Sequence, residues 1–274
     1  MNQLVAKRYL SANVVEMEIE SPLIARKRQA GHFVILKVGT RGERIPLTIA
    51  KADVVKGTIT LIIQKVGVTS HKICNLEVGD EITDVVGPLG HPTHIEKIGT
   101  LLCAGGGVGV APLLPIVEAM HNAGNRIITV LAARSKELII LEPEMRANSD
   151  EVLIMTDDGS YGKKGIVTQG MEEVITREKI DMVLTIGPAI MMKYCSLLTA
   201  KYNIPTMASL NATMVDGTGM CGACRVTVAG KTRFVCVDGP EFNAHEVDFD
   251  ELLMRLGGYK DEEKALFQQY MDNN

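Results

Sequence analysis

The sequence contains no tryptophan, and aromatic residues make up only 4% of its 274 residues. No apolar run reaches about 18 residues, so no segment is predicted to span a bilayer. The opening stretch, residues 1–10, lacks the long apolar core of a signal peptide, which predicts a cytoplasmic protein. The net charge of −4 argues against a general binder of nucleic acids or membrane surfaces. In the cytoplasm, the six cysteines are expected to be ligands, reactive thiols or core residues.

The first part of the chain, residues 1–96, is predicted to form a small antiparallel β-barrel. Short runs that alternate in polarity or are rich in branched residues lie at 14–20, 32–38, 58–66 and 80–86. Turn residues separate these runs at roughly ten-residue intervals, which is typical of a small barrel.

The pattern changes near Gly99, where strands begin to alternate with helices. This alternation predicts a doubly wound parallel sheet, with helices on both faces, over residues 97–210. Residues 211–246 are expected to form a cysteine-bearing loop followed by a hairpin, and residues 247–274 one or two amphipathic helices.

A glycine-rich run joins the first strand of the predicted sheet to a helix. It consists of Gly105, Gly106, Gly107, Val108 and Gly109. Glycine lets a phosphate-bearing ligand approach the backbone, and the following helix N-terminus offers free N–H groups. Such turns also occur without a ligand. This one lacks the G-x-G-x-x-G fingerprint, so an ordinary Rossmann dehydrogenase is not supported.

Two other predicted strands end in residues that support a ligand site. Asp157 and Asp158 follow one strand, and Gly187 and Pro188 follow another. Ligands of doubly wound sheets bind at the carboxyl ends of the strands, although turns favour these residue types in any case. Arg134 follows a third strand and suits a 2′-phosphate, an adenine or a neighbouring glutamate.

The predicted barrel carries an extended stretch between a cation and a hydroxyl: Arg44, Ile45, Pro46, Leu47 and Thr48. Proline fixes the backbone there, and arginine suits a diphosphate. Exposed arginine and threonine are, however, often merely solvated. Thr69 and Ser70 follow a glycine and offer hydroxyls to a second phosphate.

These motifs together resemble the ferredoxin–NADP reductase superfamily. The cysteine-rich tail is similar to one branch, the electron-transfer subunits of dihydroorotate dehydrogenase. The chain most resembles the small NAD-binding subunits of NADH-dependent reduced ferredoxin:NADP oxidoreductases, and the resemblance covers nearly the whole chain. It implies FAD in the barrel, NAD(H) in the α/β domain and a 2Fe–2S cluster in the tail.

The resemblance also implies which residues hold each cofactor. Those implied for the flavin are Arg44, Ile45, Pro46, Leu47, Thr48, Ile63, Gln64, Lys65, Thr69 and Ser70. Those implied for the nicotinamide nucleotide are the glycine-rich run, Arg134, Asp157, Asp158, Gly187 and Pro188. Electrons would pass from NADH through FAD and the cluster to a larger partner subunit. That partner would be a glutamate-synthase-like iron–sulfur flavoprotein, which binds ferredoxin and NADP(H) and bifurcates electrons.

Three cysteines of the tail are one ligand short of a four-ligand site. Cys221, Cys224 and Cys236 follow the spacing C-x2-C-x11-C within a glycine-rich segment. In the dihydroorotate branch, a further cysteine stands five positions before the first of them. Here that position is Asp216, so the resemblance implies a carboxylate as the fourth ligand of the cluster.

Other interpretations of this segment stay open. The cysteines could form a redox dithiol or a zinc site, and the fourth ligand could be Asp238, His245 or a partner residue. The alternative function is an electron-transfer subunit for dihydroorotate dehydrogenase or another oxidoreductase. Cys74, Cys103 and Cys195 lie inside apolar runs and are predicted to be core residues.

Overall fold

A computed structural model describes residues 2–40 and 42–273, so residues 1, 41 and 274 of the predicted barrel and tail lie outside it. The first body is an antiparallel sheet in the order β1 (Leu4–Ser11), β2 (Val14–Glu20), β5 (Thr58–Gln64), β4 (Arg44–Asp53), β3 (Phe33–Lys37) and β6 (Asp84–Leu89). Its two edges meet just before β6. There Leu4 N donates to Asp80 O at 2.9 Å, and Gly79 N donates to Leu4 O at 2.8 Å. This closure confirms the predicted antiparallel barrel.

Two short helices interrupt the strands of the barrel, and the sequence analysis did not predict them. Helix α1 (Pro22–Lys27) begins at a proline, which suits the first turn of a helix, and it buries Ile24 and Ala25 in the barrel core. Helix α2 (Val68–Cys74) begins after Gly67. The Ser70 hydroxyl caps it by accepting the Gly67 N–H at 2.9 Å.

The second body is a seven-stranded sheet with a mainly parallel arrangement. Its order is β10 (Lys163–Lys164), β9 (Glu151–Thr156), β8 (Arg126–Ala133), β7 (Thr100–Gly106), β11 (Met182–Ile186), β12 (Thr206–Ser209) and β15 (Glu241–Asn243). Only β15 runs antiparallel to its neighbour, among the strands that the structure describes. The chain starts this sheet at β7, moves outward to β8 and β9, and then returns to β11 on the other side of β7. This order confirms the doubly wound topology.

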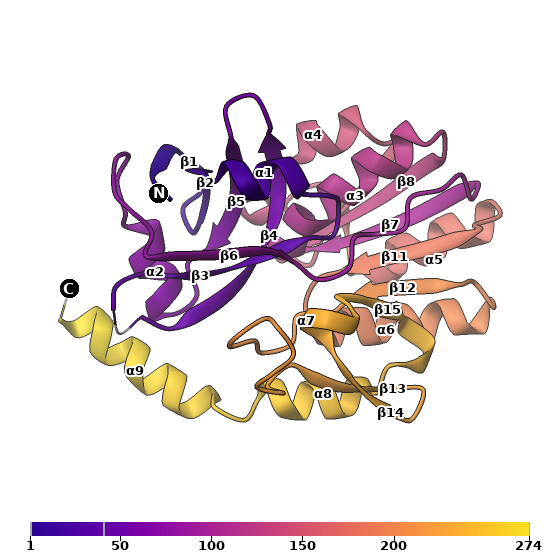
Figure 1. Cartoon of the computed structure of the whole chain (residues 1–274). Helices are drawn as coiled ribbons and strands as arrows, with labels where there is room; N and C mark the ends of the chain where they lie inside the picture. Colours follow the sequence, from indigo (N-terminus) through magenta and orange to yellow (C-terminus); the bar gives the residue numbers. More distant parts are fainter. Residues whose placement is uncertain (1, 41, 274) are drawn as a thin grey trace.

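Helices cover both faces of this sheet, as Figure 1 shows. Helices α3 (Val110–Asn122) and α4 (Glu142–Ala147) contribute to one apolar core together with β7 and β8. Helices α5 (Val167–Arg177) and α6 (Ala189–Lys201) contribute to a separate core on the other face. Burying both faces explains why the strands are continuous apolar runs rather than alternating ones.

The cysteine-bearing segment follows β12 and returns to the edge of the same sheet. Its hairpin consists of β13 (Arg225–Val228) and β14 (Lys231–Phe234), and a short helix α7 (Val235–Asp238) comes next. Cys236 was expected on the second hairpin strand, but it lies in α7. The strand β15 then pairs with β12, a contact that no local sequence pattern indicates.

The tail forms two helices, α8 (Phe249–Leu256) and α9 (Lys260–Asp272), which agrees with the expectation of one or two. Helix α8 packs against α6 and β13, and α9 runs across to α2 of the barrel (Figure 1). Among residues 2–40 and 42–273, no helix is both long and apolar enough to cross a membrane.

Asn125 fastens the connection between the barrel and the α/β sheet. Its side chain is buried and accepts the N–H groups of Ile98 (2.6 Å) and Gly99 (3.0 Å). It also donates to the carbonyls of Glu96 (2.8 Å) and Met120 (2.9 Å). The connecting segment is therefore tied to the end of α3 by one side chain.

Asn125→Ala is expected to lower the free energy of unfolding by about 2–4 kcal/mol, because it leaves several buried backbone groups without partners. Chemical denaturation followed by circular dichroism measures this change. Asn122→Ala is the control, since Asn122 is exposed at the end of the same helix. Equal stability of the two variants would show that the Asn125 network contributes little.

Candidate functional site

A cleft of about 1400 Å³ lies between the barrel and the parallel sheet. Most residues predicted to bind the cofactors line it. They are Ile45, Pro46, Leu47, Thr48, Ile63, Gln64, Thr69, Ser70, Gly106, Gly107, Val108, Gly109, Arg134, Asp157, Gly187 and Pro188. The structure therefore gathers residues from separate strands of both bodies around one space.

The α/β wall of the cleft lies where the order of strands in the parallel sheet reverses direction, between β7 and β11. Strands β7 and β11 are neighbours, and their carboxyl ends lead into Gly107 and Gly187. Gly107 has φ +55°, a left-handed conformation that glycine adopts without strain, and an added Cβ there would meet nothing within 4 Å. At such a switch point, the crevice outside the strand ends is where nucleotides bind in open α/β sheets.

The barrel wall of the cleft presents hydroxyls from β4 and α2. Within the described residues, the Thr48 hydroxyl has no hydrogen-bond partner, so it is available to a ligand. The Thr69 hydroxyl donates to Glu43 Oε2 at 2.8 Å. Ser70 is occupied locally, since its oxygen accepts Val66 N and Gly67 N, both at 2.9 Å. The Ser70 hydroxyl also donates to Gly67 O at 2.9 Å, so both hydroxyls are already engaged within the protein.

Four predicted cofactor residues do not line the cleft. Gly105 packs against α3, and the Asp158 carboxylate accepts the Ser160 hydroxyl at 2.6 Å. The Lys65 ammonium lies 5.2 Å from the centre of the Tyr9 ring. Arg44 stands at the start of β4, where its Nε is buried and, among the described residues, has no acceptor.

The cleft fits a bound dinucleotide. The backbone at Gly107 is open, so a phosphate can approach it closely. Helix α3 begins directly after the glycine-rich turn, and its N-terminus can donate N–H groups to that phosphate. These features favour an extended phosphate-bearing ligand rather than a compact apolar one.

The cysteine-bearing segment packs directly against the barrel. Cys224 and Cys236 share one apolar core with Phe33 and Ile35 of β3. Gly217 has φ +76°, and a Cβ there would lie 2.7 Å from Leu89 Cδ1 and 2.8 Å from Ile35 Cγ1. Since β3 pairs with β4, a single strand separates this loop from the stretch predicted to hold the flavin.

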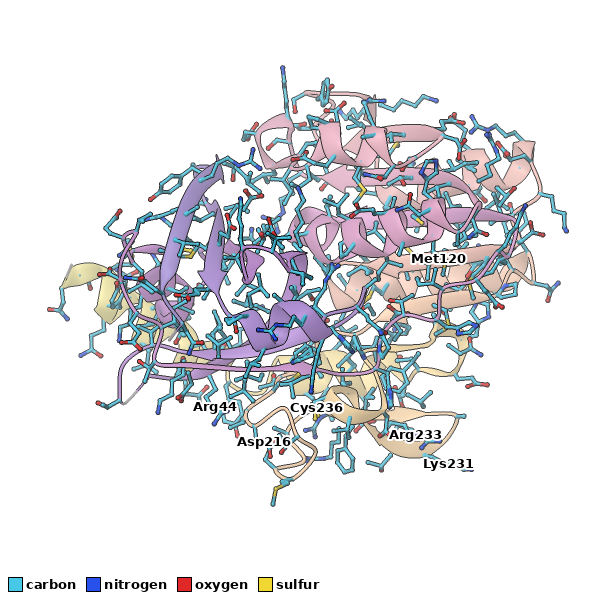
Figure 2. All side chains as sticks on the ribbon, turned by 45° about the horizontal axis from the view of Figure 1, so that its top comes forward. Arg44, Met120, Asp216, Lys231, Arg233 and Cys236 are labelled. Carbon is cyan, nitrogen blue, oxygen red and sulfur yellow. The ribbon has the colours of Figure 1, made fainter. Side chains whose placement is uncertain are left out.

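The four predicted metal ligands lie on this segment but do not converge fully. Cys224 Sγ and Cys236 Sγ are 3.2 Å apart, whereas Cys221 is exposed. Both oxygens of Asp216 accept backbone N–H groups, Oδ1 from Thr218 and Oδ2 from Cys221, each at 2.9 Å. Figure 2 shows Asp216 and Cys236 in the same region of the molecule. Among the described residues, no three potential ligands are arranged to hold a metal ion.

The chemistry of these donors nevertheless fits an iron–sulfur cluster. Three thiols and a carboxylate, which are all groups that can bind iron, stand on one glycine-rich segment. The N–H groups of Thr218 and Cys221 hold the pKa of Asp216 below its usual value, which favours the carboxylate. Burial and the Cys224 thiol raise the pKa of Cys236 to about 12, so this thiol is protonated unless iron binds it.

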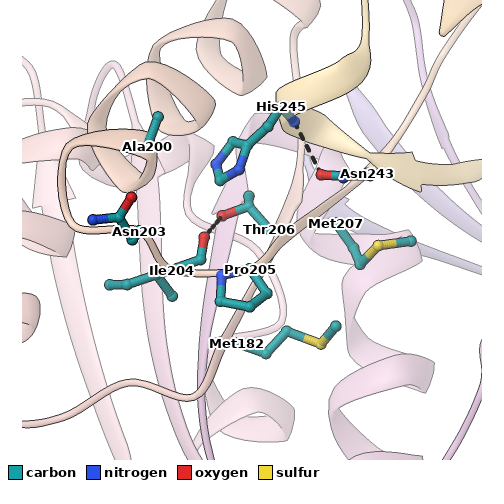
Figure 3. Close-up of a pocket in the computed structure, with 9 residues that line it drawn as sticks. All are labelled: Met182, Ala200, Asn203, Ile204, Pro205, Thr206, Met207, Asn243 and His245. Carbon is teal, nitrogen blue, oxygen red and sulfur yellow. Dashed lines mark hydrogen bonds between the residues drawn. The ribbon is translucent and has the colours of Figure 1, made fainter. Parts of the chain in front are cut away.

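The other proposed ligands are engaged elsewhere. His245 Nε2 lies 3.0 Å from Thr199 Oγ1 on α6. Its ring borders a second cavity of about 590 Å³ at the amino ends of β11 and β12 (Figure 3). Apart from His245, none of the described residues that were predicted for a cofactor or for the cluster lines that cavity. Asp238 Oδ2 accepts the Phe234 N–H at 2.7 Å, which stabilises the start of α7.

The three remaining cysteines are buried, as predicted. Burial raises the pKa of Cys74 to about 11, and those of Cys103 and Cys195 to about 12. These thiols are therefore protonated near neutral pH and suit a role in packing.

Sequence reasoning missed several residues that line the cleft. Asn211 stands two residues after the end of β12 and could have been inferred from that position, whereas Tyr194 lies inside α6. Lys260, Lys264 and Phe267 come from α9, which is far from the other lining residues in sequence. No local pattern indicates that α9 reaches the cleft.

Models of known families match two parts of the chain. Residues 211–248 match the iron–sulfur cluster binding domain of dihydroorotate dehydrogenase B, and residues 103–196 match an oxidoreductase NAD-binding domain. These matches coincide with the cysteine-bearing segment and with the sheet that carries the glycine-rich turn.

Relatives match along nearly the whole chain. A dihydroorotate dehydrogenase B (NAD(+)) electron transfer subunit homolog from Thermotoga maritima is 46% identical over 271 residues, 99% of this chain and 96% of the relative. A probable subunit of the same kind from Methanocaldococcus jannaschii is 40% identical over 200 residues, 72% of this chain and 74% of the relative.

A solved structure shows the same fold. A chain from a structure of NADH-dependent reduced ferredoxin–NADP oxidoreductase, studied for flavin-based electron bifurcation, matches with a TM-score of 0.94. It is 44% identical, and the match covers 99% of this chain and 98% of that one. The comparisons confirm the predicted ferredoxin–NADP reductase-like fold and the oxidoreductase class.

Proposed function

Because the chain belongs to the family of dihydroorotate dehydrogenase B electron transfer subunits and their homologues, we propose that it is the NAD-side subunit of an electron-bifurcating NADH-dependent ferredoxin:NADP oxidoreductase. Such a subunit exchanges a hydride with NAD(H) at FAD and passes single electrons through a 2Fe–2S cluster to a larger subunit. One observation carries the proposal: the cysteine-bearing loop packs on strand β3, which pairs with β4, and β4 lines the dinucleotide cleft.

The residues of the cleft divide into two groups by the body that carries them. Gly107 and Gly187, at the ends of β7 and β11, would hold the nicotinamide nucleotide, and Arg134 and Asp157 would flank it. Thr48 of β4, with its free hydroxyl, would orient the flavin ring from the barrel side. When bound, the flavin supplies the conversion between a two-electron hydride transfer and single-electron transfers.

The cysteine-bearing segment would carry the cluster, with Asp216, Cys221, Cys224 and Cys236 as ligands. A one-electron outlet requires a partner that accepts the electrons. We propose a larger glutamate-synthase-like iron–sulfur flavoprotein in the cytoplasm, through which ferredoxin and NADP(H) react. The names of the relatives favour a second candidate, an electron-transfer subunit of dihydroorotate dehydrogenase B. Asp216 in place of a cysteine argues against that candidate.

An anaerobic absorption spectrum of the purified chain, with iron, zinc and acid-labile sulfide measured on the same sample, tests this function. We expect about one flavin, two irons and two sulfides per chain, and bleaching of the flavin by NADH. Flavin accompanied by zinc, or by no metal, would refute the electron-conduit function.

Thr48→Val is expected to loosen the flavin roughly 3–10-fold without changing the iron content, because it removes one hydroxyl at nearly constant volume. The readouts are flavin retained per chain and the flavin absorption band. Thr60→Val is the matched control, since Thr60 lies on β5 of the same barrel but outside the cleft. If both variants retain flavin equally, Thr48 does not contact it.

A further inference from the structure

Helix α9 occupies an unusual position for a C-terminal element. It leaves α8 through Gly257 and Gly258 and runs along the lower edge of the molecule to α2 (Figure 1). None of its described residues is buried, so it contributes little to any core. The proposed electron transfer assigns no role to this helix.

Aromatic contacts hold the far half of α9 against the barrel. The ring of His71 on α2 lies 5.0 Å from the ring of Phe267 and 6.3 Å from that of Tyr270. The Lys72 ammonium lies 5.8 Å from the centre of the Tyr270 ring. Contacts of this kind are individually weak, so the attachment of α9 to α2 is modest.

The same face of α9 continues into the cleft. Lys260, Glu263, Lys264 and Phe267 line it, and their spacing places them on one side of the helix. They share the cleft with Thr69, which stands two residues before His71 on α2. Within the described residues, neither the Lys260 ammonium nor the Lys264 ammonium forms an ion pair or a hydrogen bond. Two ammonium groups and the carboxylate of Glu263 therefore line this space, and their net positive charge suits a phosphate-bearing ligand.

We propose that α9 is a cover for the flavin, in which Lys260 and Lys264 pair with the phosphates of the bound dinucleotide. The contact between Phe267 and His71 keeps the cover closed, and Gly257 with Gly258 allows it to open. The occupant is the flavin dinucleotide rather than the nicotinamide one, because α9 contacts α2 of the barrel. This inference rests on the proposed binding of FAD.

The decisive experiment measures flavin release from the purified full-length protein. Free flavin fluoresces more strongly than bound flavin, so the rise in flavin fluorescence follows its release. Lys260→Ala/Lys264→Ala is expected to release flavin roughly 10-fold faster than the unaltered protein, because two charge-assisted contacts are lost. Added salt should speed release from the unaltered protein and have little effect on the double variant.

The matched control is Lys201→Ala/Lys231→Ala, which removes the same charge from exposed positions outside the cleft. Two further variants address the cover itself: a chain ending at Gly257, and His71→Ala, which removes the aromatic contact. Both should speed release while leaving the iron content unchanged. The truncated chain keeps the proposal testable if the double variant fails to fold.

The outcomes separate this inference from the proposed function. Protein purified without any flavin would refute the proposed function itself. Flavin that is bound but released at the same rate from the unaltered, double-variant and truncated proteins would refute the cover, and the proposed function would stand. Faster release from the control pair as well would show a general charge effect and would also refute the cover.

Discussion

Asp216→Ala is expected to lose more than half of the cluster iron and sulfide, while the flavin stays bound and NADH still reduces it. The substitution removes the proposed fourth ligand, and it also removes the acceptor for the N–H groups of Thr218 and Cys221. Iron and sulfide assays with electron paramagnetic resonance of the reduced protein measure the result. A full cluster with an unchanged spectrum would show that Asp216 is not a ligand.

Loss of iron in Asp216→Ala does not show whether Asp216 is a ligand or only holds the loop through its hydrogen bonds. The variant Asp216→Cys distinguishes these two roles. A thiolate can bind iron but is a poor acceptor for backbone N–H groups. If Asp216 is a ligand, the cysteine variant keeps a cluster with an altered spectrum. If the carboxylate only orders the loop, the variant loses iron as the alanine variant does. Asp238→Ala is the control, because Asp238 is the other carboxylate near Cys236.

Gly109→Ala is expected to lower kcat/KM for flavin reduction by NADH about 10–100-fold. An added Cβ would lie 2.6 Å from Ile186 O and 2.7 Å from Gly187 Cα, and these backbone atoms cannot move aside. The ends of β7 and β11 would separate, at a cost of about 1–3 kcal/mol in stability. Stopped-flow reduction over a range of NADH concentrations measures the effect, and the flavin content should persist because the barrel is untouched.

Gly230→Ala is the control for this substitution. Gly230 has φ +71° in the hairpin between β13 and β14, and its Cβ would meet nothing within 4 Å. This variant should therefore lose some stability through backbone strain but reduce the flavin normally. An unchanged kcat/KM for NADH in Gly109→Ala would overturn the placement of the nicotinamide nucleotide at the switch point.

The wall of the cleft formed by the parallel sheet could be predicted well from the sequence. Arg134, Asp157 and Gly187 follow three different strands, and the carboxyl ends of parallel strands meet at one edge. The pattern of strands was therefore enough to predict that these residues lie close together, although no tertiary contact was known. The antiparallel barrel was predictable for a similar reason, since its short runs and turns repeat regularly.

Other features depend on contacts that are distant in sequence. The turn to α7 at Cys236, the pairing of β15 with β12 and the reach of α9 to α2 have no local signal. The direction in which a single side chain points also could not be predicted from the sequence. Lys65 was expected near the flavin, but the ring of Tyr9 attracts its ammonium to the outside of the barrel.

The pairing of β15 with β12 has a consequence for protein engineering. Ser209 stands opposite Glu241, and Leu210 N donates to Pro240 O at 2.9 Å, so the cysteine-bearing segment leaves and re-enters the sheet at adjacent points. A segment with joined ends can be exchanged as a cassette, because its length adds little to the entropy of closing the loop. A reductase scaffold of this shape can therefore take a different redox centre, or none, without changing the connections of its sheet.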